Sequence, residues 1–252
     1  MSFNVSPQAY DRFMGRYSMP LAPQLADLAG VAGGQRVLDV GCGPGALTRE
    51  LVGRVTALGV AAVDPSEQFV EAIRERHPGV SVECSGAEAL PFADAAFDAA
   101  LAQLVVQFMT APVAGLRELA RVTRPGGVVA ACVWDHGGGK GPLSPFWEVA
   151  RSLDVSAWGE SGRAGVNEGH LGELFREAGL GRVEETALSV TVKHATFEDW
   201  WEPYTFGVGP VGAFIASLDA ASQARLPELC REALPAAPFT LTVQAWAARG
   251  LA

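Results

Sequence analysis

One stretch of the chain, residues 36–48, constrains the fold more than any other. It opens with the alternating apolar residues of a short buried strand and closes that strand with an acid. Three glycines at every second position, Gly41, Gly43 and Gly45, then lead into a helix. Because glycine has no side chain, a ligand can approach the backbone there, and the first amides of the helix point to the same place. The stretch predicts a nucleotide-type site at the carboxyl end of a sheet strand.

Two ligand classes compete for this site. The spacing Gly41-x-Gly43-x-x-Ala46 satisfies the dinucleotide fingerprint, although this match is weak by itself. Asp39 favours the other class, because a carboxylate two residues before the first glycine repels a diphosphate and attracts a cation. S-adenosylmethionine has an ammonium and a sulfonium and no phosphate. The alternative is that Asp39 only caps the next helix.

Composition limits the remaining function classes. A chain of 252 residues, 49% of them apolar, fits one large domain or a domain with an insertion. The net charge of −9, without a Lys/Arg cluster, argues against nucleic acid as a partner. With no membrane-length apolar run and no signal-peptide pattern at the start, we expect a cytoplasmic protein that does not bind membranes. Four scattered cysteines lack metal-ligand spacing, so we expect no metal site and small buried thiols at the following positions: Cys42, Cys84, Cys132 and Cys230.

The first half of the chain alternates apolar runs with helical patterns. We expect further strands at 60–64, 80–84, 97–101 and 128–134. Continuous apolar strands that alternate with helices predict a parallel sheet covered on both faces. Asp64 closes the second strand, where an acid accepts hydrogen bonds from ribose hydroxyls in mononucleotide-binding folds.

The second half and the N-terminal segment have a different character. We expect a sixth strand at 182–194 and a last, antiparallel edge strand at 239–247. Between them, the aromatic-rich segment 196–236 predicts a helical lid that sets substrate choice, with core packing as the alternative. Residues 8–19 are aromatic and basic, which predicts either a helix packed on the sheet or a flap. In the flap, Arg16 would meet a carboxylate of the ligand and Tyr10 or Tyr17 would cover it.

Four segments together resemble a known family, the class I S-adenosylmethionine-dependent methyltransferases, in the small-molecule branch of the ubiquinone and menaquinone enzymes. The resemblance covers about residues 35–134 and rests on these segments: Val37 to Thr48, Ala62 to Ser66, Ala87 to Phe92, and Arg124 to Val128. It implies a Rossmann-like three-layer α/β sandwich with seven strands, the last one antiparallel to the others. It also implies S-adenosylmethionine as cofactor, S-adenosylhomocysteine as product, and in-line methyl transfer to a small-molecule acceptor.

The resemblance assigns roles to individual residues. Asp39 and Gly41 would hold the amino-acid end of the cofactor, and the carbonyl of Ala102 would accept from its ammonium. Cys42, Gly43 and Gln103 are further expected cofactor-binding residues. The nucleoside would lie against the following residues: Asp64 at the ribose, Pro65 and Ser66 beside the adenine, and Ala87 at the adenine edge.

The chain departs from the family at two positions. Gly86 stands where members often have an aspartate that reaches the adenine amine, so that contact is lost or Glu88 replaces it. Gln107 stands where many members have a histidine, which removes a ready general base. A base is needed only if the acceptor must lose a proton early.

Catalytic residues are therefore left open. The candidates are His136, Asp135, Tyr204, His170 and Gln107, each with a solvated or capping role as the alternative. His194, at the end of a strand, is expected to face solvent.

We expect one methyltransferase domain over residues 1–252. It would consist of an N-terminal flap and helix at 1–34, a cofactor-binding core at 35–134 and the lid at 196–236. Two other functions remain: an S-adenosylmethionine-binding module without turnover and an NAD-dependent oxidoreductase. Asp39 and the lack of a second dinucleotide-binding half disfavour the oxidoreductase.

Overall fold

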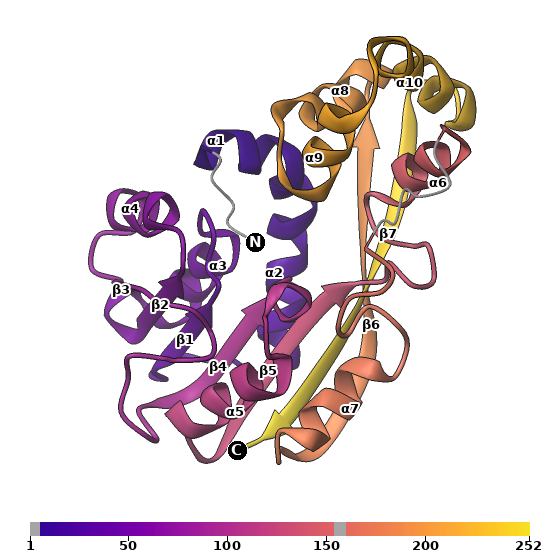
Figure 1. Ribbon diagram of the computed structural model, residues 1–252. Helices are drawn as coiled ribbons and strands as arrows, with labels where there is room; N and C mark the ends of the chain where they lie inside the picture. Colours follow the sequence, from indigo (N-terminus) through magenta and orange to yellow (C-terminus); the bar gives the residue numbers. More distant parts are fainter. Residues whose placement is uncertain (1–5, 154–159) are drawn as a thin grey trace.

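A computed structural model describes residues 6–153 and 160–252 (Figure 1). Its strands form one seven-stranded sheet in the order β3-β2-β1-β4-β5-β7-β6. The strands are β1 (Val37–Val40), β2 (Val60–Asp64), β3 (Ser81–Cys84), β4 (Phe97–Gln103), β5 (Thr123–Trp134), β6 (Gly181–His194) and β7 (Phe239–Leu251). Strand β7 is antiparallel to both of its neighbours, while the other paired strands run parallel. The predicted Rossmann-like α/β fold is confirmed.

One detail of the sheet prediction is wrong, because β7 is not at the edge. It lies between β5 and β6, and β6 is the edge strand. Burial explains the order. Residues on β7 such as Ala245, Ala247 and Ala248 are buried on both faces of the sheet, whereas most side chains of β6 are exposed or half-buried.

Helices cover both faces of the sheet (Figure 1). The core residues form two clusters, one with α2, α3 and α4 on one face and one with α5 and α7 on the other. Successive residues of a strand fall into different clusters, as Val37 and Leu38 do, because side chains alternate across a sheet. The helices are α1 (Pro7–Tyr10), the π-helix η1 (Asp11–Gly15), α2 (Arg16–Leu28), α3 (Ala46–Val55), η2 (Ala57–Gly59), α4 (Glu67–Arg76), η3 (Val106–Phe108), α5 (Pro112–Val122), α6 (Ser144–Leu153), α7 (His170–Glu177), α8 (Phe197–Trp201), η4 (Glu202–Phe206), α9 (Gly209–Ser217) and α10 (Ala220–Ala233).

Helices α6, α8, α9 and α10 gather at one end of the long β6–β7 pair (Figure 1). Thr196 caps α8 by accepting a hydrogen bond from the amide of Asp199 at 3.1 Å, as the sequence predicts. The aromatic rings of this region pack on one another; Tyr204, for example, stacks on Phe146 with ring centroids 5.2 Å apart. Phe13 of the N-terminal segment meets Tyr204 edge to face, so the two predicted covers of the site touch each other.

Two smaller predictions are also corrected. Cys84 is exposed at the end of β3, whereas the other three thiols are buried. The sequence also predicts a helix over 168–178, but α7 begins at His170, because Gly169 before it adopts a positive φ of +81°. Within the described residues, none of the helices has the length and apolar character that crossing a membrane requires.

Candidate cofactor site

The glycine turn after β1 requires glycine at each of its three positions. Gly41, Gly43 and Gly45 have φ values of +69°, +52° and +103°, a region that other residues enter at a cost. A Cβ on Gly41 would lie 2.5 Å from Val105 Cγ2, and one on Gly45 would lie 2.8 Å from Ile73 Cδ1. A Cβ on Gly43 would have no described atom within 4 Å. Packing therefore forbids a side chain at two positions, while at Gly43 only the backbone conformation does.

Asp64 at the end of β2 fixes this turn. One carboxylate oxygen accepts a hydrogen bond from the amide of Gly43 at 2.9 Å, and the other accepts one from Ser66 at 2.8 Å. Burial raises the pKa of Asp64, and the two amide hydrogen bonds oppose that shift. The acid thus joins the glycine turn to the loop after β2.

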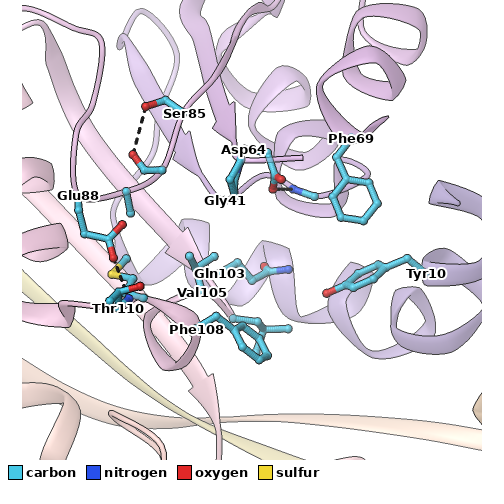
Figure 2. A pocket seen from close by; sticks show the side chains of 16 residues that line it. Tyr10, Gly41, Asp64, Phe69, Ser85, Glu88, Gln103, Val105, Phe108 and Thr110 are labelled. Carbon is cyan, nitrogen blue, oxygen red and sulfur yellow. Dashed lines mark hydrogen bonds between the residues drawn. The ribbon is translucent and has the colours of Figure 1, made fainter. Parts of the chain in front are cut away.

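A cavity of about 270 Å³ lies at the carboxyl ends of β1, β2 and β4 (Figure 2). Tyr10 and Phe69 meet edge to face along one side of it, with centroids 5.5 Å apart. The predicted cofactor residues that line it are Tyr10, Gly41, Gly43, Asp64, Pro65, Ala87, Glu88 and Gln103. Residues far apart in the sequence therefore converge on one cavity.

Other predicted cofactor residues do not line the cavity in the described structure. Ala102 lies fully buried inside β4, paired with Ala131 of β5. Cys42 is buried in the glycine turn, and the amide of Ser66 is used by Asp64. Their predicted contacts with the cofactor stay predictions.

The prediction for Arg16 is wrong. Its guanidinium is not free to meet a ligand carboxylate, because it donates to His194 Nδ1 and to Asp199 Oδ1, each at 3.0 Å. His194 does not face solvent as expected; its exposed fraction is 0%. Both corrections have one cause, a contact between segments almost 180 positions apart that no local pattern reveals.

The protonation of His194 follows from its partners. A guanidinium only donates, so Nδ1 must be the acceptor, and Nε2 bears the proton and donates to the Tyr17 hydroxyl 3.1 Å away. Burial lowers the pKa of His194 to about 4, and the charge of Arg16 adds to the shift while Asp199 opposes it. The imidazole is therefore neutral at pH 7.

Two buried acceptor atoms at the strand tips have no hydrogen-bond partner among the described residues. Thr48 donates to one oxygen of Asp39 at 2.6 Å and leaves the other oxygen, Oδ1, unpaired. Gln103 donates through Nε2 to the carbonyl of Ser18 at 3.0 Å and leaves Oε1 unpaired. Buried acceptors are normally satisfied, and an ammonium group offers three donors. This pair fits the amino-acid end of S-adenosylmethionine.

Burial determines the charge state of Asp39. Only 1% of it is exposed. Burial raises its pKa to about 7, with the Thr48 hydrogen bond opposing and the charge of Asp64 adding to the shift. Asp39 is thus a buried acid at the base of the glycine turn, whose ionised form a nearby cation would favour.

Glu88 lines the cavity but already has backbone partners. Its Oε1 accepts hydrogen bonds from the amides of Thr110 at 2.8 Å and Ala111 at 3.3 Å, next to the start of α5 (Figure 2). Whether it replaces the family's aspartate beside the adenine stays a prediction.

The catalytic candidates are scattered. Tyr204 is buried among aromatic rings, and its hydroxyl donates to the carbonyl of Pro142 at 3.3 Å, which fits the core-packing alternative. Asp135 accepts from the Gly138 amide at 2.6 Å, and His170 accepts from the Gly165 amide at 3.3 Å.

Gln107 and His136 line a second, smaller cavity of about 40 Å³. His136 Nε2 lies 3.7 Å from the Glu160 carboxylate, which lines the same cavity. Sequence reasoning missed Glu160, since it follows a stretch without any recognisable motif and only the fold brings it to His136.

Known proteins share the fold of this chain and match the segment that contains its glycine turn. Residues 38–131 match the family model described as "Methyltransferase domain". A malonyl-[acyl-carrier protein] O-methyltransferase of Erwinia pyrifoliae is 36% identical, over 48% of this chain and 45% of that protein. A demethylmenaquinone methyltransferase of Renibacterium salmoninarum is 34% identical, over 44% of this chain and 46% of that protein. The chain thus matches about half the length of these relatives.

Solved structures extend the likeness in fold to almost the whole chain. The YcgJ protein of Bacillus subtilis superimposes with a TM-score of 0.59 at 19% identity, over 93% of this chain and 97% of that one. This likeness shows the fold, and the glycine turn lies within the residues that match the family model. Over residues 38–131 the chain is similar to the methyltransferase domain family. The predicted resemblance to methyltransferases is confirmed.

Proposed function

We propose that the protein transfers a methyl group from S-adenosylmethionine to a small-molecule acceptor by in-line displacement. The main supporting observation is the cavity at the carboxyl ends of β1, β2 and β4. Gly43, Asp64 and Gln103 line it, and buried acceptor atoms of Asp39 and Gln103 at these strand ends have no partner among the described residues. A sulfonium-bearing amino acid needs such acceptors, whereas a diphosphate needs donors.

The residues of the cavity would share the binding of the cofactor. Asp39, Gly41 and Gln103 would hold its amino-acid end, and Asp64 would accept hydrogen bonds from the ribose. Pro65 and Ala87 would lie beside the adenine. When bound, S-adenosylmethionine supplies a methyl group that its positive sulfur already activates.

The protein's task is then to align the acceptor and exclude water. Orientation alone can lower the barrier of such a reaction by about 7–11 kcal/mol at best. Tyr10, which lines both cavities, would cover the reacting groups.

We further propose that residues 196–236 act as a lid over a cofactor-binding core at 35–134. The N-terminal part at 1–34 would take part in the same cover. Arg12 supports this, because it pairs with Glu202 at 2.8 Å and lies over the ring of Phe206 at 4.7 Å. Exchange of the lid with that of a relative should change substrate choice; unchanged choice would show that the segment is only core.

A binding module without turnover is the second candidate, because Gln107 cannot act as a general base. Two measurements separate the methyltransferase from the binding module and from a dinucleotide-binding protein. S-adenosylhomocysteine at 100 times its dissociation constant should stabilise the protein by about 2.7 kcal/mol, and reduced nicotinamide dinucleotide should not. Transfer of a labelled methyl group to compounds of an acceptor library would establish turnover. Stabilisation by the dinucleotide alone would refute the proposal.

A further inference from the structure

The second cavity adjoins the cofactor cavity. Tyr10, Leu104 and Phe108 line both spaces and separate them with their side chains. The far wall comes from η1 and from the start of α9, that is, from the two segments that cover the site. A molecule in the second cavity would therefore lie next to the cofactor and beneath both covers.

The lining of the second cavity is mainly apolar and aromatic, and its polar atoms are mostly acceptors. Gln107 presents a buried Oε1 without a partner among the described residues. Glu160 presents a carboxylate with only 4% of the residue exposed. Trp134 has an indole N–H that also has no partner among the described residues. A ligand that satisfies these groups must offer a donor to the acceptors.

The charges around the second cavity nearly balance. Burial lowers the pKa of His136 to about 4, so the imidazole is neutral at pH 7. Burial raises the pKa of Glu160 to about 7, with the charge of Arg163 opposing that shift. The guanidinium of Arg163 lies 3.7 Å from the Glu160 carboxylate and offsets its charge. Neither a cation nor an anion would gain a net partner there, and each would lose hydration.

We propose that the second cavity is the acceptor site and takes a neutral, largely apolar molecule with one O–H or N–H donor directed at Glu160 and Gln107. This inference rests on the proposed methyl transfer, because it assigns the acceptor half of the same site. It makes Glu160 a residue that selects the substrate by hydrogen bonding, and Phe108 and Tyr10 the walls between the acceptor and the cofactor. At about 40 Å³ the cavity is smaller than a single ring needs, so a ring-shaped acceptor would enter only if the two covers move apart.

Four probes with one ring shape test the proposal. 4-Methylphenol is neutral with a donor, 4-methylanisole is neutral without one, 4-methylbenzoate is an anion and 4-methylbenzylamine is a cation. Each is titrated calorimetrically into the full chain saturated with S-adenosylhomocysteine at pH 7.5. We expect 4-methylphenol to bind at least about tenfold more tightly than the other three, as one hydrogen bond to a charged group implies.

Two variants locate the effect. Glu160→Gln keeps the shape of the side chain and should weaken 4-methylphenol about tenfold while leaving 4-methylanisole unchanged. Glu148→Gln is the matched control, since Glu148 is an exposed acid that lines only the neighbouring polar pocket. It should change nothing. Gln107→Met provides a second test if Glu160→Gln does not fold.

The outcomes separate this proposal from the previous one. If S-adenosylhomocysteine does not bind, the proposed function fails. If it binds normally, equal affinity for all four probes, tighter binding of an ion, or no binding of 4-methylphenol overturns the acceptor assignment alone. Loss of 4-methylphenol affinity in both Glu160→Gln and Glu148→Gln would also overturn it. The loss would then come from the change in net charge and not from a lost contact with Glu160.

Discussion

Arg16 donates a hydrogen bond to Nδ1 of His194 at 3.0 Å and so ties the first turn of α2 to the end of β6. Tyr17 reaches the other ring nitrogen, and Asp199 completes an ion pair with Arg16. Tyr10, which lines the cofactor cavity, precedes this contact by six positions in the chain. Both proposed covers meet at one buried imidazole.

The stability that His194 provides should depend on pH. Its pKa is about 4 in the folded protein and about 6.5 in the unfolded chain, so the unfolded state binds more protons between these values. The contribution is complete above about pH 6.5 and is lost as the pH falls toward 4, with a slope of at most about 1.4 kcal/mol per pH unit. Urea unfolding of the wild type and His194→Gln from pH 4.5 to 8 measures it. The difference in unfolding free energy should shrink at low pH; a constant difference would contradict the assigned neutral tautomer.

Gly41→Ala should destabilise the protein by roughly 1–3 kcal/mol and weaken S-adenosylhomocysteine binding, because the new Cβ combines a positive φ with a clash against Val105. Gly53→Ala is the control, since Gly53 is exposed in α3 with no described atom near an added Cβ. It should be stabilising by about 0.5–1 kcal/mol. Chemical denaturation and calorimetry measure both effects. Equal stability of the two variants would show that the turn tolerates a side chain.

Asp64→Ala should weaken the binding of S-adenosylhomocysteine by about 1.5–3 kcal/mol, which is the loss expected for hydrogen bonds to a charged group. Asp94→Ala removes the same charge at an exposed position paired with Arg121 and should leave the affinity as it is. Calorimetric titration compares the two. An unchanged affinity in Asp64→Ala would remove the acid from the proposed ribose contact.

Tyr204→Phe tests whether Tyr204, a catalytic candidate from the sequence, lies in the core and not in the binding site. The variant loses one hydrogen bond to Pro142 and keeps the aromatic packing, so the unfolding free energy should fall by about 0.5–1.5 kcal/mol. Cofactor affinity should not change, because the hydroxyl does not line the described cofactor cavity. A large loss of affinity with normal stability would place Tyr204 in the binding site after all.

The sequence predicts the cofactor half of the site well because that half is local. A strand, a glycine turn and a helix are encoded within 13 residues, and the acid at the end of β2 follows the same rule. What the pattern does not report is the burial of Asp39. Its position at the strand tip is correct, but the turn buries it and Thr48 binds one of its oxygens.

The remaining features depend on contacts between distant segments, which neither the hydrophobic periodicity of the sequence nor a motif can predict. His194 ends an alternating strand and looks exposed until Tyr17 and Arg16 reach it from the N-terminal segment. Similarly, β7 resembles an edge strand until β6 pairs with its outer side. Glu160 becomes a site residue only through its approach to His136.

The central claim is that this sheet edge prefers the amino-acid end of a sulfonium cofactor over a diphosphate. Competition calorimetry tests it most directly, with S-adenosylhomocysteine titrated into the protein in the presence and absence of reduced nicotinamide dinucleotide. We predict one site for S-adenosylhomocysteine whose apparent affinity the dinucleotide leaves unchanged. Displacement of S-adenosylhomocysteine by the dinucleotide at comparable concentration would contradict the claim.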